Sequence, residues 1–172
     1  ITLNAKKAGT VKLKVYMLKD KSISKTVTVK FSSATEISEI EDDSGISDMS
    51  YAEQILYYVN IEREKEGLSP LKLDDKLCKA ADIRAKEITE SFSHTRPDGA
   101  EWSSVFAEVG FKGTGGENIA AGNDTAEATV AQWMASDGHR ANILNKNYTV
   151  LGAGAEYDKN SMYHWYWVQL FS

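Results

Sequence analysis

The spacing of apolar residues changes twice along this chain, and these changes limit the folds that it can adopt. Residues 11–16 and 26–31 alternate apolar with polar side chains, which predicts two antiparallel strands around a turn at residues 19–22. From residue 51 onward the apolar residues recur at helical spacing, and residues 148–157 and 161–171 again favour strands. Helices followed by a late sheet predict a mixed α+β architecture.

Two longer helices are expected first in the helical part. One covers residues 51–66, and a second begins at Asp74 or Asp75, either of which can cap it. The side chains of the second helix that are expected to face the core are Leu77, Ala81, Ile83, Ala85 and Ile88.

Further helices and a close contact are expected later in the chain. A short helix is expected over residues 101–109, and Asp124 with Glu127 forms a capping-box pattern that opens another. Gly152 and Gly154 lie in an expected strand, where they leave room for another backbone or a packed helix.

The chain divides by composition into three parts. Residues 1–31 hold the expected β-hairpin, and residues 32–50 are rich in Ser, Asp and Glu without a sustained period, which is typical of an acidic linker. Residues 51–172 hold the main domain. An isolated two-stranded hairpin is marginal in water. The hairpin is therefore either a remnant of another module or an arm docked on the main domain.

Charge and cysteine content narrow the class of protein. The 172 residues carry a formal net charge of −5, so no basic surface for nucleic acid is indicated. No apolar run approaches the roughly 18 residues needed to cross a bilayer, and no leader pattern opens the sequence. Cys78 is the single cysteine, so no disulfide can form within the chain, and a buried apolar role is favoured for it over a reactive thiol.

Three short polar segments carry the strongest functional signal. His94 lies in Ser-His-Thr-Arg-Pro-Asp-Gly, Glu117 lies in Gly-Glu-Asn-Ile-Ala, and His139 follows Ser-Asp-Gly. Imidazole and carboxylate groups at three separate places predict one assembled polar site. Neutral imidazole is the commonest metal ligand in proteins, and catalytic zinc takes three protein ligands and one water. The three side chains could therefore hold zinc or another divalent metal.

In this order, the segments resemble the CAP superfamily, which comprises cysteine-rich secretory proteins, antigen 5 and pathogenesis-related 1 and is also called SCP-like. The likeness runs from about residue 51 to residue 172 and is nearest to the bacterial branch. It implies a three-layer α/β/α sandwich with an antiparallel central sheet, and it makes His94, Glu117 and His139 the residues of the family's cleft. The phrase at residues 6–10 resembles the end of a group 2 bacterial Ig-like domain.

One departure from the family weakens the metal prediction. The resemblance implies a site of two histidines and two acids, whereas in this sequence Ser136 stands where the second acid is expected. Asp137 is a weak candidate to replace it. Losing an acid removes negative charge and should weaken a divalent cation site. Asn118, Arg140 and Asn142 are expected to have scaffold roles, and His164 is expected to be a packed or edge histidine outside the site.

The resemblance leaves several functions open. The favoured one is a secreted or cell-surface binding module whose ligand is a lipid, a peptide or a cell-surface component. The alternatives are a metal-dependent hydrolase of peptides or cell-wall material, with Glu117 as its general base, and a structural module of a surface protein. No nucleophile in an activating context is evident, so an enzyme is the less favoured class.

Overall fold

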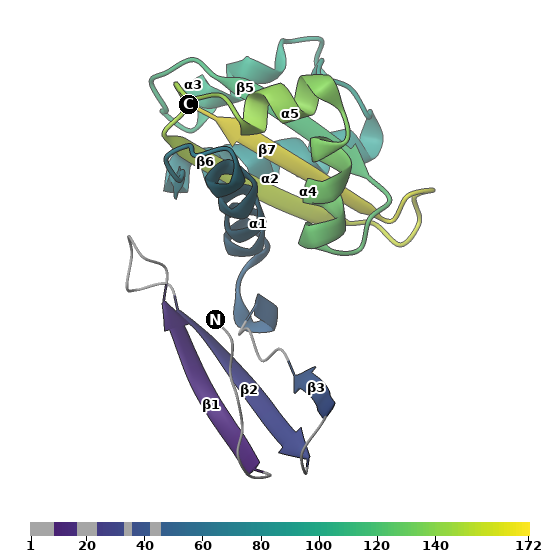
Figure 1. Ribbon diagram of the computed structural model, residues 1–172. Coiled ribbons are helices and arrows are strands. Elements are labelled where there is room, and N and C mark those ends of the chain that lie inside the picture. Colours follow the sequence, from purple (N-terminus) through teal and green to yellow (C-terminus); the bar gives the residue numbers. More distant parts are fainter. Residues whose placement is uncertain (1–8, 17–23, 33–35, 42–45) are drawn as a thin grey trace. The chain divides into compact units, whose positions relative to one another are not determined.

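The computed structural model describes residues 9–16, 24–32, 36–41 and 46–172 (Figure 1). Contacts divide the chain into two units, Ile1–Met49 and Ser50–Ser172. Within the described residues, no helix is both long enough and apolar enough to span a bilayer.

The N-terminal unit contains a small antiparallel sheet in the order β1-β2-β3. The strands are β1 (Gly9–Tyr16), β2 (Ser24–Ser32) and β3 (Glu36–Glu41), and a short 3-10 helix, η1 (Ile46–Asp48), follows. β1 and β2 pair over the two segments expected to form the hairpin. The turn expected at residues 19–22 lies outside the described residues.

The third strand is a difference from the sequence analysis, because β3 lies within the expected linker at residues 32–50. Ile37 and Ile40 are three residues apart, which does not match the period of two expected for a strand. They pair with Phe31 and Val29, which are two apart, and the register shifts between these pairs. The extra residue of this bulge hides the strand from a search for strict alternation.

The C-terminal unit is built on a four-stranded sheet in the order β4-β6-β7-β5. The strands are β4 (Lys72–Leu73), β5 (Gly116–Ala121), β6 (Val150–Tyr157) and β7 (Trp165–Phe171). β7 pairs antiparallel with both β5 and β6, while the two-residue β4 lies parallel to β6. With helices on both faces, the predicted α+β fold and three-layer sandwich are confirmed.

One face of the sheet is covered by α2 (Asp75–Glu90), with η2 (Trp102–Ser104) and α3 (Val105–Glu108) beside it. A Cβ atom on Gly152 would lie 2.1 Å from the backbone carbon of Leu77, and one on Gly154 would lie 2.6 Å from that of Ala81. The prediction that these glycines admit a close neighbour is confirmed, and the neighbour is the backbone of α2. Burial raises the pKa of the half-buried Cys78 thiol on this helix.

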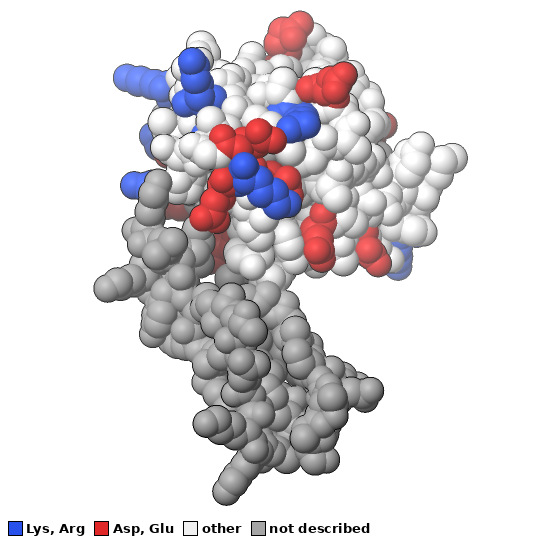
Figure 2. All heavy atoms as spheres, viewed as in Figure 1, with Lys and Arg blue, Asp and Glu red and all other residues white. Residues whose placement is uncertain are grey.

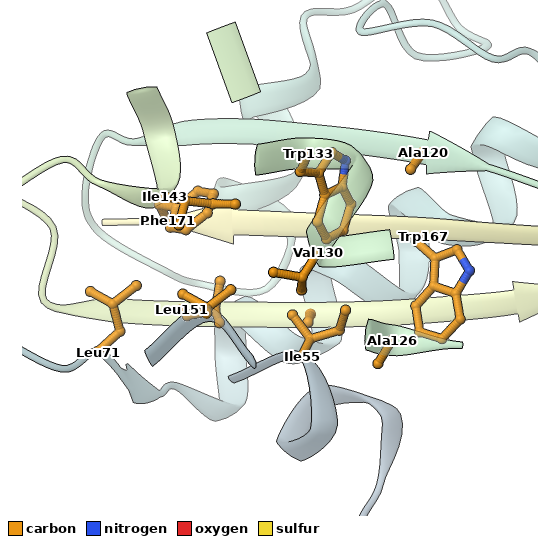
Figure 3. Close-up of a cluster of buried hydrophobic side chains, with 12 residues drawn as sticks. Ile55, Leu71, Ala120, Ala126, Val130, Trp133, Ile143, Leu151, Trp167 and Phe171 are labelled. Atoms are coloured by element: carbon orange, nitrogen blue, oxygen red, sulfur yellow. The ribbon is translucent and has the colours of Figure 1, made fainter. Parts of the chain in front are cut away.

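The other face is covered by α1 (Tyr51–Lys65), α4 (Ala126–Met134) and α5 (Asp137–Ile143). Figure 3 shows the core between these helices and the sheet, in which Trp133 and Ile143 lie over β7, the strand that carries Trp167 and Phe171. α5 is a second difference, because the sequence analysis expects no helix over these residues.

The helix starts are set by polar side chains. Ser50 and Glu53 form a complete capping box on α1, and Asp74 caps α2 through the backbone N–H groups of residues 76 and 77. For α4 the expected cap at Asp124 is wrong. Thr125 is the N-cap, because its hydroxyl accepts the N–H of Ala128 three residues later.

Charged side chains are interspersed on the surface of this unit. On the face that Figure 2 shows, acidic and basic groups lie next to one another and no extended basic area stands out. Arg140 and Glu66 form one exposed ion pair at 2.8 Å.

Candidate functional site

Two of the three predicted site residues are in direct contact. Glu117 lies on β5 with its side chain fully buried, and its Oε2 lies 2.7 Å from Nδ1 of His94. His94 follows α2 in a loop, and 54% of its side chain is exposed. The contact therefore ties an exposed imidazole to a carboxylate inside the protein.

Arg84 on α2 is a member of this site that the sequence analysis missed. Its Nε donates to Oε1 of Glu117 at 2.8 Å, and the side chains of both residues are fully buried. Its two other nitrogens donate to Oε2 of Glu87 and to the backbone oxygen of Ser93, the residue before His94. Arg84 thus binds both the carboxylate and the segment that carries the imidazole.

A signal for Arg84 was present in the sequence. It lies three residues after Ala81 and four before Ile88, both of which were expected on the buried side of the helix. A charged residue at such a position needs a partner of opposite charge inside the protein. The partner could not be named, because Glu117 is far away in sequence.

A second arginine extends the charge network toward the surface. Arg96 donates to both carboxylate oxygens of Glu87 and to Glu108. Burial alone would raise the pKa of Glu87, but hydrogen bonds from Arg96 and Arg84 hold it below its ordinary value. The network comprises the cations Arg84 and Arg96 and the carboxylates Glu87, Glu108 and Glu117.

His139 lies on α5, close enough to His94 for the two rings to influence each other. Burial lowers the pKa of His139, and the charge of His94 lowers it further. The neutral form of His139 is therefore favoured at neutral pH. The two histidines come from segments on either side of the edge strand β5 in the sequence.

Asn118 links β5 to the helix that carries His139. Its Nδ2 donates to the backbone oxygen of His139 and to Oε1 of Gln169, and its Oδ1 accepts from Nδ2 of Asn142. Asn142 also donates to the backbone oxygen of Glu117 at 3.3 Å. These bonds give Asn118 and Asn142 positioning roles, while Arg140 points to Glu66 at the surface.

Arg63 supports the same helix from α1. It is buried, and its guanidinium donates to the backbone oxygens of Ser69, Ile143 and Asn145. Two of these acceptors lie at the C-terminal end of α5, where the carbonyl groups lack helical partners. A helix of seven residues is thereby fixed at its end.

The two other residues considered in the sequence analysis are Asp137 and His164. Asp137 is exposed in the first turn of α5. His164 is not on a strand, because β7 begins at Trp165. Its φ of 61° places it in the left-handed region, in the turn before that strand.

The carboxylate of Glu117 already has a partner on each oxygen, Arg84 on one and His94 on the other. A metal ion bound to Glu117 would therefore have to share the carboxylate with these groups or displace one of them. Across the described part of the chain, no three or more His, Cys, Asp or Glu side chains are grouped so as to hold a metal ion. What the geometry leaves for a ligand is the outer nitrogen of His94 together with the His139 ring.

The sandwich and the His–Glu pair define a class of protein, and comparison with known families agrees with it. Residues 56–171 match the family model described as CAP, the cysteine-rich secretory protein family. The chain belongs to this family, and the predicted resemblance is confirmed for the C-terminal unit. The match begins after the N-terminal sheet, so the likeness of that segment to an Ig-like domain stays a prediction.

Two relatives come from Bacillus subtilis (strain 168). The uncharacterized protein YkwD is 38% identical over 108 residues, which is 61% of this chain and 42% of YkwD. The uncharacterized membrane protein YlbC is 34% identical over 119 residues, which is 65% of this chain and 34% of YlbC. The chain thus spans less than half the length of either relative.

Solved structures share the fold at lower identity. An extracellular SCP-domain protein of Bacillus anthracis has a TM-score of 0.63 at 21% identity, covering 93% of this chain and 66% of that one. An outer surface protein of Borrelia burgdorferi has a TM-score of 0.60 at 21% identity, covering 72% and 94%. A cysteine-rich secretory protein of Staphylococcus aureus has a TM-score of 0.57 at 20% identity, covering 81% and 44%.

Proposed function

We propose that this chain is a binding module that acts outside the cell or at the cell surface, and that its ligand contacts His94 and His139. The location is supported by the structural neighbours, two of which are described as extracellular and as an outer surface protein. The ligand class that we propose to test first is bacterial cell-wall material, because both sequence relatives are bacterial proteins.

The observation that carries the proposal is the anchoring of His94. Its side chain is 54% exposed, yet its Nδ1 is held by a carboxylate that is fully buried. An exposed side chain ordinarily loses rotamer freedom when it binds a ligand, and that loss opposes binding. Because Glu117 already restricts the ring, less of this cost remains when a ligand arrives.

The contacts of Glu117 also favour a binding module over a hydrolase. A general base must reach the proton that it removes, directly or through one water. The oxygens of Glu117 instead lie 2.8 Å from Arg84 and 2.7 Å from His94. Glu117 therefore serves as a positioning group in this proposal, and a hydrolase remains the alternative class.

A divalent cation held by the two imidazoles is the second candidate ligand. It is favoured by the contact between Glu117 and His94, because metal-binding histidines usually donate their other nitrogen to a carboxylate or carbonyl. Two imidazoles provide fewer protein ligands than a typical zinc site. We therefore expect weak zinc binding, with most coordination positions left to water or to the ligand.

The test compares the full chain, the double variant His94→Ala/His139→Ala and the control His164→Ala. Each is mixed with purified Gram-positive cell-wall sacculi, and the bound fraction is measured by sedimentation. We expect wild type and control to sediment alike and the double variant to bind at least tenfold more weakly. Equal sedimentation of all three proteins would overturn the site.

Zinc titration by calorimetry on the same three proteins tests the second candidate. Heat of binding that disappears only in the double variant would support a two-imidazole metal site. Release of soluble fragments from the sacculi, abolished by Glu117→Gln, would instead support the hydrolase and contradict the binding module.

A further inference from the structure

Three side chains form a line of hydrogen bonds from the interior to the surface. Arg84 donates from Nε to Oε1 of Glu117 at 2.8 Å, and Oε2 of Glu117 lies 2.7 Å from Nδ1 of His94. Arg84 and Glu117 are fully buried, whereas His94 is half exposed. The outer end of this line is therefore the only part that a ligand can approach.

The direction of each bond in this line is fixed by chemistry. A guanidinium has donors and no acceptor, and it stays charged in proteins. An ionised carboxylate has acceptors and no donor. Since Arg84 pairs with Glu117 as a buried ion pair, the nitrogen that meets the other carboxylate oxygen must supply the proton. That nitrogen is Nδ1 of His94.

We infer that Arg84, acting through Glu117, fixes neutral His94 as the tautomer with its proton on Nδ1, so that Nε2 presents a lone pair to the ligand. The cell-wall group that binds there is then a hydrogen-bond donor, such as a hydroxyl or amino group, and not a carboxylate or phosphate. The statement about the ligand rests on the proposed function, whereas the tautomer does not.

The charges around the site agree with a donor ligand. The network that runs from the interior to the surface contains two cations, Arg84 and Arg96, and three carboxylates, Glu87, Glu108 and Glu117. One negative charge is in excess. His139, the other nearby ring, is held toward its neutral form by burial and by His94. An anion would therefore meet no unpaired positive charge in this group.

Arg84 is suited to this positioning role because its fork reaches three acceptors. Besides Glu117 it binds Oε2 of Glu87 at 2.6 Å and the backbone oxygen of Ser93 at 2.7 Å. The bond to Ser93 holds the residue before His94 at a fixed place relative to the carboxylate. A lysine has a single nitrogen and could not hold all three in this planar arrangement.

The decisive variant is Glu117→Gln, which keeps the shape of the side chain. Arg84 can accept no hydrogen bond, so it must take the amide oxygen, and the amide NH₂ then faces Nδ1 of His94. Nδ1 becomes an acceptor and the proton moves to Nε2. In the double variant Arg84→Met/Glu117→Gln the amide can turn over, so this constraint is removed.

The tautomer is read by long-range ¹H–¹⁵N correlation spectra of the ¹⁵N-labelled full chain near pH 8, above the ordinary histidine pKa of about 6.5. We expect Nδ1–H for His94 in wild type, Nε2–H in Glu117→Gln, and a mixture in the double variant. The signals of His164 serve as the internal control and should not change. Dispersed backbone amide signals verify that each variant is folded.

Two results would overturn the inference. One is Nε2–H for neutral His94 in wild type, which needs no variant to fold. The other is an unchanged tautomer in folded Glu117→Gln. For the ligand class, inorganic phosphate should leave the His94 nitrogen shifts unchanged, and saturable phosphate binding that is lost in His94→Ala would contradict a donor ligand.

These outcomes separate the inference from the proposed function, because the tautomer is measured without a ligand. If it inverts in Glu117→Gln while sacculi still bind His94→Ala/His139→Ala, the inference stands and the binding site fails. If the tautomer does not invert in Glu117→Gln but His94→Ala/His139→Ala no longer binds the sacculi, the proposed binding site stands and the proposed role of Arg84 is wrong.

Discussion

Two arginines buried in the C-terminal unit have different kinds of hydrogen-bond partner, and the difference distinguishes their roles. Arg63 donates to backbone oxygens at the end of α5, whereas Arg84 pairs with the carboxylates of Glu87 and Glu117. Removing a partner from a buried charge is expensive, because the remaining group is left without compensation. Both arginines therefore fix their surroundings: Arg63 holds the end of the helix that carries His139, and Arg84 holds the carboxylate that contacts His94.

At the residue scale, His139 should make stability depend on pH. Its pKa in the folded protein is lowered, first by burial and then by His94. Above about pH 6.5 the ring is neutral in both the folded and unfolded states, so its contribution is complete. As pH falls below that value the unfolded chain takes up the proton first, and the free energy of unfolding declines.

The expected result is that wild type loses more stability than His139→Asn between about pH 7.5 and pH 5.5, as measured by urea unfolding. Titrating groups that do not interact with His139 are common to both proteins and cancel in the comparison. His164→Asn, which replaces a histidine outside the site, should behave like wild type. Parallel curves for wild type and His139→Asn would contradict a perturbed His139.

The sequence analysis predicted that His94 and Glu117 lie in one site, but it did not predict that Arg84 holds the carboxylate of Glu117. Family order alone brought those two residues together, since their separation in sequence matches no compact motif. The role of Arg84 was not predicted, because helical spacing indicates which side of a helix is buried but not which distant strand packs against that side. The direction of the Asn118 amide toward α5 was hidden for the same reason.

At the element scale, the approach of α2 to β6 depends on glycine. A Cβ atom on Gly154 would lie 2.6 Å from the backbone carbon of Ala81 and 2.7 Å from the backbone nitrogen of Asp82. Backbone cannot swing aside like a side chain, so Gly154→Ala should destabilise the unit by about 2 kcal/mol or more. Chemical denaturation measures this change.

Gly138→Ala is the matched control for the same substitution. Gly138 lies in α5, and a Cβ atom there would meet nothing within 4 Å. Alanine in a helix is favoured over glycine by roughly 0.5–1 kcal/mol, so this variant should be slightly more stable than wild type. Equal effects of the two substitutions would show that close packing against α2 is not the cause.

Helices and strands were predicted correctly where the periodicity of apolar residues is strong, and they were missed where long-range contacts determine the local structure. The helix expected over residues 51–66 is observed at Tyr51–Lys65. β5 and α5 were not predicted, because Gly-Glu-Asn-Ile-Ala-Ala is a poor strand former and α5 has only seven residues. β5 forms by pairing with β7, and α5 is held by Arg63 and Asn118.

At the scale of the whole molecule, residues 50–172 should fold without the N-terminal unit. The capping box that starts α1 is made by Ser50 and Glu53, and both apolar clusters draw on residues of the C-terminal unit. We expect a fragment of residues 50–172 to unfold cooperatively, with a midpoint within a few degrees of that of the same unit in the full chain. Calorimetry provides the measurement.

Limited proteolysis of the full chain gives an independent check. The protected fragment should begin between residues 42 and 50, after β3, and mass spectrometry identifies its first residue. A protected fragment that begins before residue 42, or a truncated chain that fails to fold, would mean that the first 49 residues belong to the fold of the second unit.

The outer edge of β5 has a consequence for how this domain can associate with others. β5 is the last strand of its sheet, and the backbone oxygens of Glu117 and Ile119 accept hydrogen bonds from the side chains of Asn142 and Trp133. An unpaired strand edge ordinarily invites a strand from another chain, which leads to β-augmentation or aggregation. Here two side chains from α4 and α5 occupy that edge, so adding a strand would require displacing the helix that carries His139.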